Sequence, residues 1–325
     1  MGRRRPDHLH GVLVVDKPTG VSSQDVVTRV RLRLGVRSAG HTGTLDPLAT
    51  GVLPICLGQA TKIAQWLLGE DKRYRCDCEL GLVSPTHDSE GEVARRAEVE
   101  RIDAEALDAA VASLRGEQLQ VPPMHSAIKV GGRRLHALAR EGVEIDRAPR
   151  PVRIDELTVV AVSGPRVTLD VACSKGTYVR ALVRDLGERL GVGAVMTGLR
   201  RTASGAFAVA DALPLADVDR ATAAARLVPI ASALGLPPVE VHDAAVIDVV
   251  NGHELRLARY AEGMVEGQRF QLVSTRGETL AVAERRAGRT FLHRVLTYPW
   301  MGLDAAARVP QSPPPNPHGH EAGPE

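Results

Sequence analysis

The sequence predicts an α/β (α+β) protein, with a mixed central sheet in a large domain and a small β-rich domain at the C-terminus. Strand-like and helix-like stretches alternate through residues 11–208. Several of the strand-like stretches alternate apolar and polar residues at a period of two, which is typical of half-buried strands. A Leu-Pro-Pro linker at 236–238 separates these elements from a second, strand-rich group.

Residues 11–35 predict a strand, a turn and a helix in that order. GVLVVDK is strand-like, and the following Pro-Thr-Gly is a turn sequence. Ser22 with Asp25 three residues later is a helix N-terminal signal. Apolar residues then recur at helical spacing until Gly35, which we expect to end the helix.

The next stretch predicts elements of both kinds, namely a strand over 52–58, a helix over 60–69, a strand over 74–82 and a helix over 105–116. In YRCDCEL, Cys76 and Cys78 alternate with charged residues, so we expect them on the buried face of a strand. With Cys56 and Cys173 they show no zinc-ribbon spacing, and we expect no metal.

Residues 120–141 form a long excursion that opens with two prolines and carries Gly131 and Gly132. Such a segment is either a plain linker or a binding loop. Its basic, glycine-hinged composition favours a binding loop.

Residues 152–208 predict two strands joined by a Ser-Gly-Pro turn, an amphipathic helix over 175–191, and two further strands around a Ser-Gly turn. We expect residues 11–236 to form one domain and residues 239–300 a small β-rich domain. The basic residues 1–10 form an N-terminal arm. The proline-rich tail 309–325 is expected to be disordered, because it buries too little apolar surface to offset its ordering entropy.

Composition narrows the class of protein. No apolar stretch reaches ~18 residues, so no membrane span is expected, and the N-terminus lacks the features of a signal peptide. We therefore expect a cytoplasmic protein. The formal net charge of +2 is small for a nucleic-acid binder, although arginines cluster locally. Those clusters are either a solvated face or a binding surface.

The stretch GHTGTLDPLATG, residues 40–51, places a single carboxylate, Asp46, among glycines and a proline. It is not a phosphate loop, because Gly51 is followed by Val-Leu-Pro rather than by Lys-Ser or Lys-Thr. His41 and Asp46 are too few for a metal site. Two interpretations remain open from the residues: a turn in which Asp46 bonds to local backbone, or a carboxylate held at the floor of a cleft.

The wider set of motifs resembles the bacterial tRNA pseudouridine synthase family of the TruB type. The motifs follow one another from Gly11 to Arg201 and are VVDKPTGVSS, GHTGTLDPLATGVLPICLGQATK, DKRYR, CSKGTYVRALVRDLGERLG and GLRRT. The resemblance implies a pseudouridine-synthase catalytic domain that isomerises the T-loop uridine at position 55 of tRNA. It also implies a PUA-like C-terminal domain. The fragment of this region that matches such a domain best is VVNGHEL.

The resemblance also implies roles for individual residues. It makes Asp46 the catalytic carboxylate, Tyr74 the ring that stacks on the flipped uracil, and Arg180 the partner of the carboxylate. It assigns supporting positions in substrate binding to His41, Tyr178, Leu199, Lys17 and Lys62. Where the family usually has Thr-Asp-Thr, this chain has Ser84-Pro85-Thr86-His87-Asp88, which puts the role of that segment in doubt.

The implied reaction breaks the N1–C1′ bond, turns the base and reattaches it through C5. No redox change or group transfer occurs, so we expect no cofactor. The carboxylate acts either as a nucleophile at C1′ or as a base at C2′, and the sequence does not choose between them. An arginine beside it is expected to keep it ionised. The target base must be flipped out of its stack.

The expected partner is tRNA, contacted at the T-loop and acceptor arm, with residues 120–141 as an RNA-binding excursion. A monomer is the default expectation. Two rival functions share part of this pattern: an RNA-binding or tRNA-folding protein without chemistry, and a synthase that acts on a different RNA. A pure binder has no need of Asp46, Tyr74 and Arg180 together.

Overall fold

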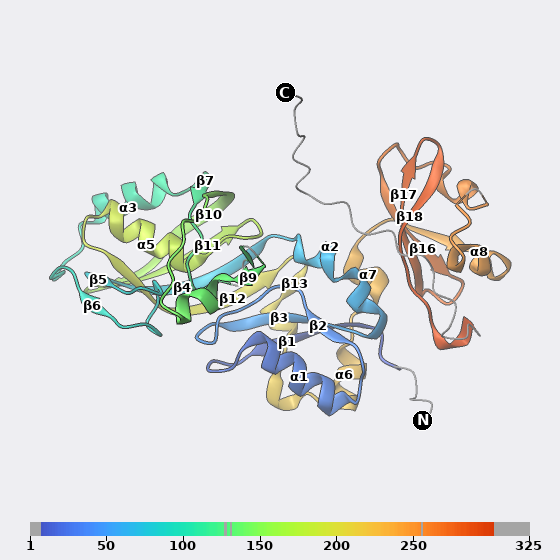
Figure 1. Cartoon of the computed structure of the whole chain (residues 1–325), viewed down its shortest axis with the longest axis horizontal. Coiled ribbons are helices and arrows are strands. Elements are labelled where there is room, and N and C mark those ends of the chain that lie inside the picture. Colours follow the sequence, from blue (N-terminus) through green and yellow to red (C-terminus); the bar gives the residue numbers. More distant parts are fainter. Residues whose placement is uncertain (1–7, 127–128, 131, 255, 302–325) are drawn as a thin grey trace. The chain divides into compact units, whose positions relative to one another are not determined.

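The computed structural model describes residues 8–126, 129–130, 132–254 and 256–301. They form two compact units, 8–228 and 229–301. The larger unit contains a long mixed sheet and the smaller unit a four-stranded sheet (Figure 1). None of the helices in the described part of the chain has the length and apolarity that crossing a membrane requires. The expected arm and tail lie mostly or wholly outside the described residues.

Ten strands of the larger unit form its main sheet, in the order β14-β1-β3-β12-β4-β11-β10-β7, with β2 paired to β3 and β13 to β12. Their bounds are β1 Gly11–Lys17, β2 Ala39–His41, β3 Thr50–Leu57, β4 Lys72–Leu80, β7 Gly116–Gln120, β10 Arg150–Ser163, β11 Arg166–Cys173, β12 Ala194–Ser204, β13 Phe207–Ala208 and β14 Leu213–Pro214. β12 pairs in parallel with β3 and antiparallel with β4, so it joins the two halves of the sheet.

The remaining elements of the larger unit are mostly helical. They are α1 Ser23–Leu34, η1 Gly58–Ile63, α2 Ala64–Leu68, α3 Ala104–Ser113, α4 Leu135–Arg140, α5 Val179–Arg189, η2 Val209–Asp211, η3 Leu215–Asp217 and α6 Arg220–Arg226. Two small hairpins complete it, β5 Leu82–Val83 with β6 Ala94–Arg95 and β8 Lys129–Val130 with β9 Arg133–Arg134.

Helix α1 has the ends that its sequence predicts. Ser22 and Asp25 form a reciprocal capping box, in which each side chain bonds to the backbone of the other residue. Gly35 closes the helix in the left-handed conformation at φ 66°. Valines at helical spacing turn into the core between these two ends.

Two hydrophobic cores cover different halves of the sheet. One packs α1 against β1 and β3, and the other packs α3 and α5 against β4, β10 and β11 (Figure 1). Cys76 and Cys78 are buried in the second core, as their alternation predicts. Tyr74 and Leu199 contact both cores, so they lie where the two halves of the sheet meet.

Some predicted boundaries differ from the structure. The helix expected over 60–69 is a 3₁₀ turn followed by the short α2, and Gly69 follows it in the right-handed region at φ −72°. The helix expected to end at Gly116 ends at Ser113. Gly116, at φ 84°, instead opens β7, a strand that the sequence does not predict.

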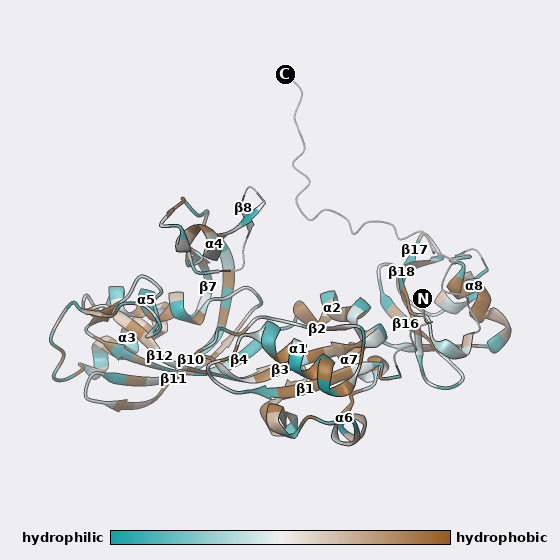
Figure 2. Cartoon of the chain, turned by 60° about the horizontal axis from the view of Figure 1, so that its bottom comes forward, coloured by the Kyte–Doolittle hydropathy of each residue, from teal (hydrophilic) through white to brown (hydrophobic). Residues whose placement is uncertain are grey.

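The excursion contains local structure of its own. The β8–β9 hairpin and α4 project from the end of β7 (Figure 2). Buried Leu135 and Leu138 of α4 pack with Met124 in a small separate core. The excursion is therefore a folded appendage of the sheet edge.

The smaller unit contains α7 Ile230–Leu234, β15 Pro238–Val241, η4 Asp243–Ala245, α8 Val246–Val250, η5 Ala258–Ala261, β16 Arg269–Ser274, β17 Thr279–Arg286, β18 Arg289–Val295 and η6 Pro299–Met301. Its sheet has the order β15-β16-β17-β18, with β15 and β16 parallel. A core of its own packs α8 and η5 against this sheet.

Candidate active site

The loop that carries Asp46 connects β2 to β3 and is fixed from several sides. The Ala49 N–H donates to the Asp46 carbonyl at 3.0 Å, which makes a tight turn at the carboxylate. On α1, the Ser23 hydroxyl accepts from the Leu45 N–H at 2.8 Å and donates to the Leu45 carbonyl at 3.0 Å. Asp46 is thus anchored through its neighbours, and its side chain is free to face the site.

Lys17, at the end of β1, holds the other side of this loop. Its fully buried ammonium donates to the carbonyls of Ala49 at 2.6 Å, Pro18 at 2.9 Å and Pro47 at 3.2 Å. Burial lowers the pKa of Lys17 to about 8, with Asp46 acting in the opposite direction. The lysine therefore supports the turn that presents Asp46.

Arg180 lies in the first turn of α5 and reaches Asp46. Its Nε atom lies 3.0 Å from Asp46 Oδ2, an ion-pair contact without hydrogen-bond alignment, and its Nη2 donates to Oδ1 at 3.3 Å. The same guanidinium donates to the carbonyls of His125 at 2.8 Å and Thr86 at 3.2 Å. The Arg180 side chain is only 5% exposed, whereas that of Asp46 is 32% exposed. The arginine is fixed by protein groups, and the carboxylate retains an open side.

The pKa of Asp46 is shifted in the direction opposite to the one that a neighbouring arginine alone would produce. Burial raises the pKa of Asp46, the charge of Asp88 raises it further, and the charges of Arg180 and Lys17 lower it. The net direction is upward. Arg180 thus opposes the cost of burying the carboxylate without fully cancelling it.

Asp88 is a site residue whose role its local sequence does not define. It is buried, and its Oδ2 lies 3.6 Å from Arg180 Nη1. Its Oδ1 accepts from the Thr86 hydroxyl at 2.6 Å and from the Glu90 N–H at 3.1 Å. The departure from the family pattern at Pro85 therefore leaves a carboxylate beside Arg180. The motif alone could not show this, because the contact spans two distant segments.

Tyr178 is held by the strand that precedes the excursion. The buried Gln120 carboxamide accepts from the Tyr178 N–H at 2.8 Å and donates to its carbonyl at 3.2 Å. Burial raises the pKa of the Tyr178 hydroxyl. No sequence signal identified Gln120, since a lone glutamine in a strand carries no motif.

Tyr74 extends from β4 toward the same region, and its neighbour is the buried Arg201. Burial raises the pKa of Tyr74, and the charge of Arg201 lowers it. The Asp46 charge acts on both Tyr74 and Tyr178, which places the two rings within its electrostatic reach. Leu199 lies on β12 and packs against the same two cores as Tyr74.

His41 lies at the end of β2 and Lys62 lies in η1. The His41 Nδ1 accepts from the Gly43 N–H at 3.3 Å, and burial lowers the pKa of this histidine. Lys62 is half-buried. The structure thus brings together Asp46, Arg180, Lys17 and the two tyrosines.

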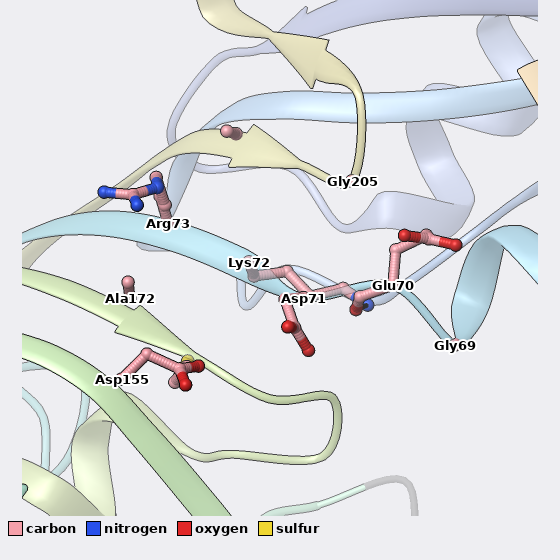
Figure 3. A pocket seen from close by; sticks show the side chains of 10 residues that line it. Gly69, Glu70, Asp71, Lys72, Arg73, Asp155, Ala172 and Gly205 are labelled. Atoms are coloured by element: carbon pink, nitrogen blue, oxygen red, sulfur yellow. Dashed lines mark hydrogen bonds between the residues drawn. The ribbon is translucent and has the colours of Figure 1, made fainter. Parts of the chain in front are cut away.

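A polar pocket of about 500 Å³ lies elsewhere on the larger unit, where the turn before β4 meets the ends of β11 and β12 (Figure 3). Glu70, Asp71 and Asp155 contribute carboxylates to its wall. Lys72 and Arg73 line it as well, and its lining residues do not include Asp46, Arg180 or Lys17, so the pocket is separate from the Asp46 site. The described residues contain no cluster of three or more His, Cys, Asp or Glu side chains that could hold a metal.

Comparisons with known proteins place these motifs in a family. Residues 31–179 match the TruB family pseudouridylate synthase N-terminal domain, and residues 180–234 match the tRNA pseudouridylate synthase B C-terminal domain. The tRNA pseudouridine synthase B of Cupriavidus metallidurans is 44% identical over 292 residues, covering 86% of this chain and 92% of that protein. The protein of the same name from Geobacillus kaustophilus is 46% identical over 266 residues, covering 78% and 93%.

Solved structures show the same fold. A crystal structure of a Cbf5-Nop10-Gar1 complex matches with a TM-score of 0.62 and 26% identity, covering 85% of this chain and 78% of that one. An H/ACA RNP bound to a substrate RNA containing 2′-deoxyuridine matches with a TM-score of 0.65 and 24% identity, covering 90% and 88%. The mixed sheet predicted from the sequence is confirmed by these likenesses.

Proposed function

The chain belongs to the TruB family of pseudouridylate synthases, and from this membership we propose that Asp46 is the carboxylate with which it isomerises the T-loop uridine of tRNA. The observation that carries the proposal is the Asp46–Arg180 ion pair, in which a fixed arginine faces a partly open carboxylate. A carboxylate in this setting can approach a ribose while its charge is balanced by the guanidinium.

The reaction breaks the bond between N1 of uracil and C1′ of ribose and forms a bond between C5 and C1′. Asp46 either attacks C1′ and holds the sugar covalently, or removes the C2′ proton while the base departs. A uridine deuterated at C2′ distinguishes the two routes. Proton removal predicts a primary isotope effect on the rate, and attack at C1′ predicts none.

The two tyrosines supply the nucleotide pocket in this proposal. Flipping the uridine out of its loop costs a few kcal/mol, and an aromatic face recovers ~1–3 kcal/mol by stacking. Tyr74 lies at the junction of the two cores, and Tyr178 lies at the start of α5. The charge of Asp46 raises the pKa of both tyrosines. His41 fills the space left in the loop, and Leu199 forms an apolar wall.

The finer expectations about the RNA also belong to this proposal. The excursion at 120–141 and the C-terminal PUA-like domain at 239–300 contact the T-loop and acceptor arm through phosphate and shape recognition. Lys62 contributes a supporting charge. The enzyme acts as a cytoplasmic monomer. Because the isomerisation moves no electrons to or from the substrate, its chemistry calls for no redox cofactor.

The decisive experiment replaces Asp46 with asparagine, which keeps the size and removes the charge. Uridine-containing tRNA is incubated with wild-type protein, Asp46→Asn and the control Asp108→Asn, an exposed change on α3. We expect Asp46→Asn to bind tRNA normally while pseudouridine formation falls by ~10³-fold or more. Wild-type product from Asp46→Asn would refute the catalytic role and favour an RNA-binding function without chemistry at this residue.

The choice of RNA needs a separate measurement. Pseudouridine is mapped across total RNA from cells with and without the protein. The proposal predicts loss at the T-loop uridine of tRNA. Loss confined to another RNA would support the rival synthase with a different substrate.

A further inference from the structure

The first turn of α5 carries Arg180 but lacks the groups that usually hold the start of a helix. Tyr178 is the N-cap residue, and among the described residues its side chain makes no capping hydrogen bond to α5. The first turn has no acidic residue and instead carries the Arg180 cation near the positive end of the helix dipole. A helix start of this kind frays unless another segment holds it. The contact between Arg180 and Asp46 therefore needs support from outside α5.

Gln120, at the end of β7, supplies that support. Its side chain is buried, at 4% exposure. Its Oε1 accepts from the Tyr178 N–H at 2.8 Å, and its Nε2 donates to the Tyr178 carbonyl at 3.2 Å. The same carbonyl accepts from the Leu182 N–H at 3.1 Å, where the backbone hydrogen bonds of α5 begin. In a capping box a side chain of the helix itself binds the N–H of the N-cap residue, whereas here a strand distant in sequence does so.

The chain that follows Gln120 also reaches the guanidinium. Gln120 is followed by Val-Pro-Pro-Met and then by His125, whose carbonyl accepts from Arg180 Nη2 at 2.8 Å. Both prolines are buried, and each ring fixes φ near about −65°. Residues 120–125 therefore form a stiff clamp, with one contact on the backbone of Tyr178 and another on the side chain of Arg180.

We propose that Gln120 is a positioning residue for the isomerisation, and that it acts through Arg180. The inference rests on the proposed function. By fixing the N–H and the carbonyl of Tyr178, the carboxamide fixes the point of α5 from which the Arg180 side chain extends. Catalytic groups need placement to within about 0.5 Å, which a frayed helix turn does not provide. The clamp thus keeps the guanidinium on Asp46 while the nucleotide enters.

A double-mutant cycle tests this role. The variants are Gln120→Met, Arg180→Lys and the two together. Methionine keeps the length of the side chain and removes both hydrogen bonds to Tyr178. We expect Gln120→Met to lower kcat about tenfold, with KM for tRNA within about twofold. In the Arg180→Lys background the same change should lower kcat by less than about twofold more, because the group through which Gln120 acts is already gone.

Gln118→Met is the matched control. Gln118 lies two positions earlier on β7, and its Nε2 donates to the carbonyls of Arg115 at 3.2 Å and Ser113 at 3.4 Å. The change therefore removes similar hydrogen bonds from the same strand, but these lead to the end of α3 instead of to α5. We expect kcat within about twofold of the wild type. Equal losses of kcat in Gln118→Met and Gln120→Met would show a general loosening of β7 and would overturn the proposal.

Two further results would overturn it. One is an additive cycle, in which Gln120→Met costs as much in the Arg180→Lys protein as in the wild type. The other is a wild-type kcat for Gln120→Met. If that variant does not fold, Gln120→Glu decides the matter in the same way, because an ionised carboxylate still accepts from the Tyr178 N–H but cannot donate to the carbonyl. We expect its kcat to fall about fivefold or more.

The proposed function is tested separately from this role. Any of the overturning results, obtained with the wild-type protein active and Asp46→Asn inactive, leaves the proposed function intact. Absence of pseudouridine with the wild-type protein would instead remove the proposed function itself.

Discussion

Arg180 and Asp46 lie 134 positions apart in the chain and form an ion pair across the junction of the two sheet halves. The pair is asymmetric, since the arginine is nearly buried and the aspartate is partly open. The carbonyls of Thr86 and His125 accept hydrogen bonds from the Arg180 guanidinium, and the Asp88 carboxylate lies beside it. A ligand entering the site therefore meets the carboxylate, while the guanidinium stays part of the protein framework.

Replacing Arg180 with lysine should strongly impair the reaction. Lysine retains a charge but loses the fork that contacts Asp46 and two carbonyls together. We expect kcat to fall ~10²-fold or more, with a smaller loss of stability. Steady-state kinetics on tRNA provide the measurement. Arg189→Lys, an exposed change on the same helix, should leave kcat within twofold, and an equal effect of both changes would contradict a specific role for Arg180.

Replacing Asp88 with asparagine should shift the pH dependence of the rate. The charge of Asp88 raises the pKa of Asp46, so its removal lowers that pKa and leaves Asp46 ionised to lower pH. The acid limb of the kcat profile should therefore move to lower pH. At neutral pH kcat should fall ~3- to 10-fold, because Arg180 loses a contact. Asp185→Asn is the control on α5, and a shift of the acid limb to higher pH for Asp88→Asn would count against this electrostatic account.

Replacing Lys17 with methionine should alter stability and activity in different ways. Burial lowers the pKa of Lys17 to about 8, so between pH 8 and 10.5 the unfolded chain binds more protons than the folded chain. Lys17 therefore makes the free energy of unfolding rise with pH in that window, and Lys17→Met should remove this rise. Urea unfolding at several pH values measures it.

Activity provides the second readout for Lys17. Above about pH 8 a neutral amine donates at most two of the three bonds to the loop carbonyls, so kcat should decline there in the wild type. Lys17→Met should have a lower kcat at every pH. The exposed Lys175→Met control should keep the wild-type slope of unfolding free energy, and an unchanged slope in Lys17→Met would exclude this lysine as its source.

Replacing Gly51 with alanine should be unusually costly. Gly51 has φ 100°, and a Cβ there would lie 2.2 Å from the Arg201 carbonyl oxygen. We expect a loss of ~3 kcal/mol or more in the free energy of unfolding. Gly20 has a similar positive φ of 80° but open space around it, so Gly20→Ala should cost only ~1 kcal/mol. Equal costs in chemical denaturation would show that the close approach to β12 does not matter.

Local rules in the sequence predict much of the fold. The capping box and left-handed glycine of α1 involve residues close in the chain, and the alternation at Cys76 and Cys78 follows from the strand period. The strand β7 was not predictable in this way. Gly116 looks like a helix stop by its local sequence, and only pairing with β10 makes it the start of a strand.

The sequence by itself determined the family and therefore the chemistry. Each of the motifs that carry Asp46, Tyr74 and Arg180 is an unbroken stretch of the chain, and the motifs follow one another in the family's order. Tertiary structure alone decided how these residues act on one another. Asp88, Gln120 and Arg201 support the site through contacts that cross strands and segments. Such contacts, and the burial that raises the pKa of Asp46, depend on which elements pack together, and no local pattern of residues encodes that.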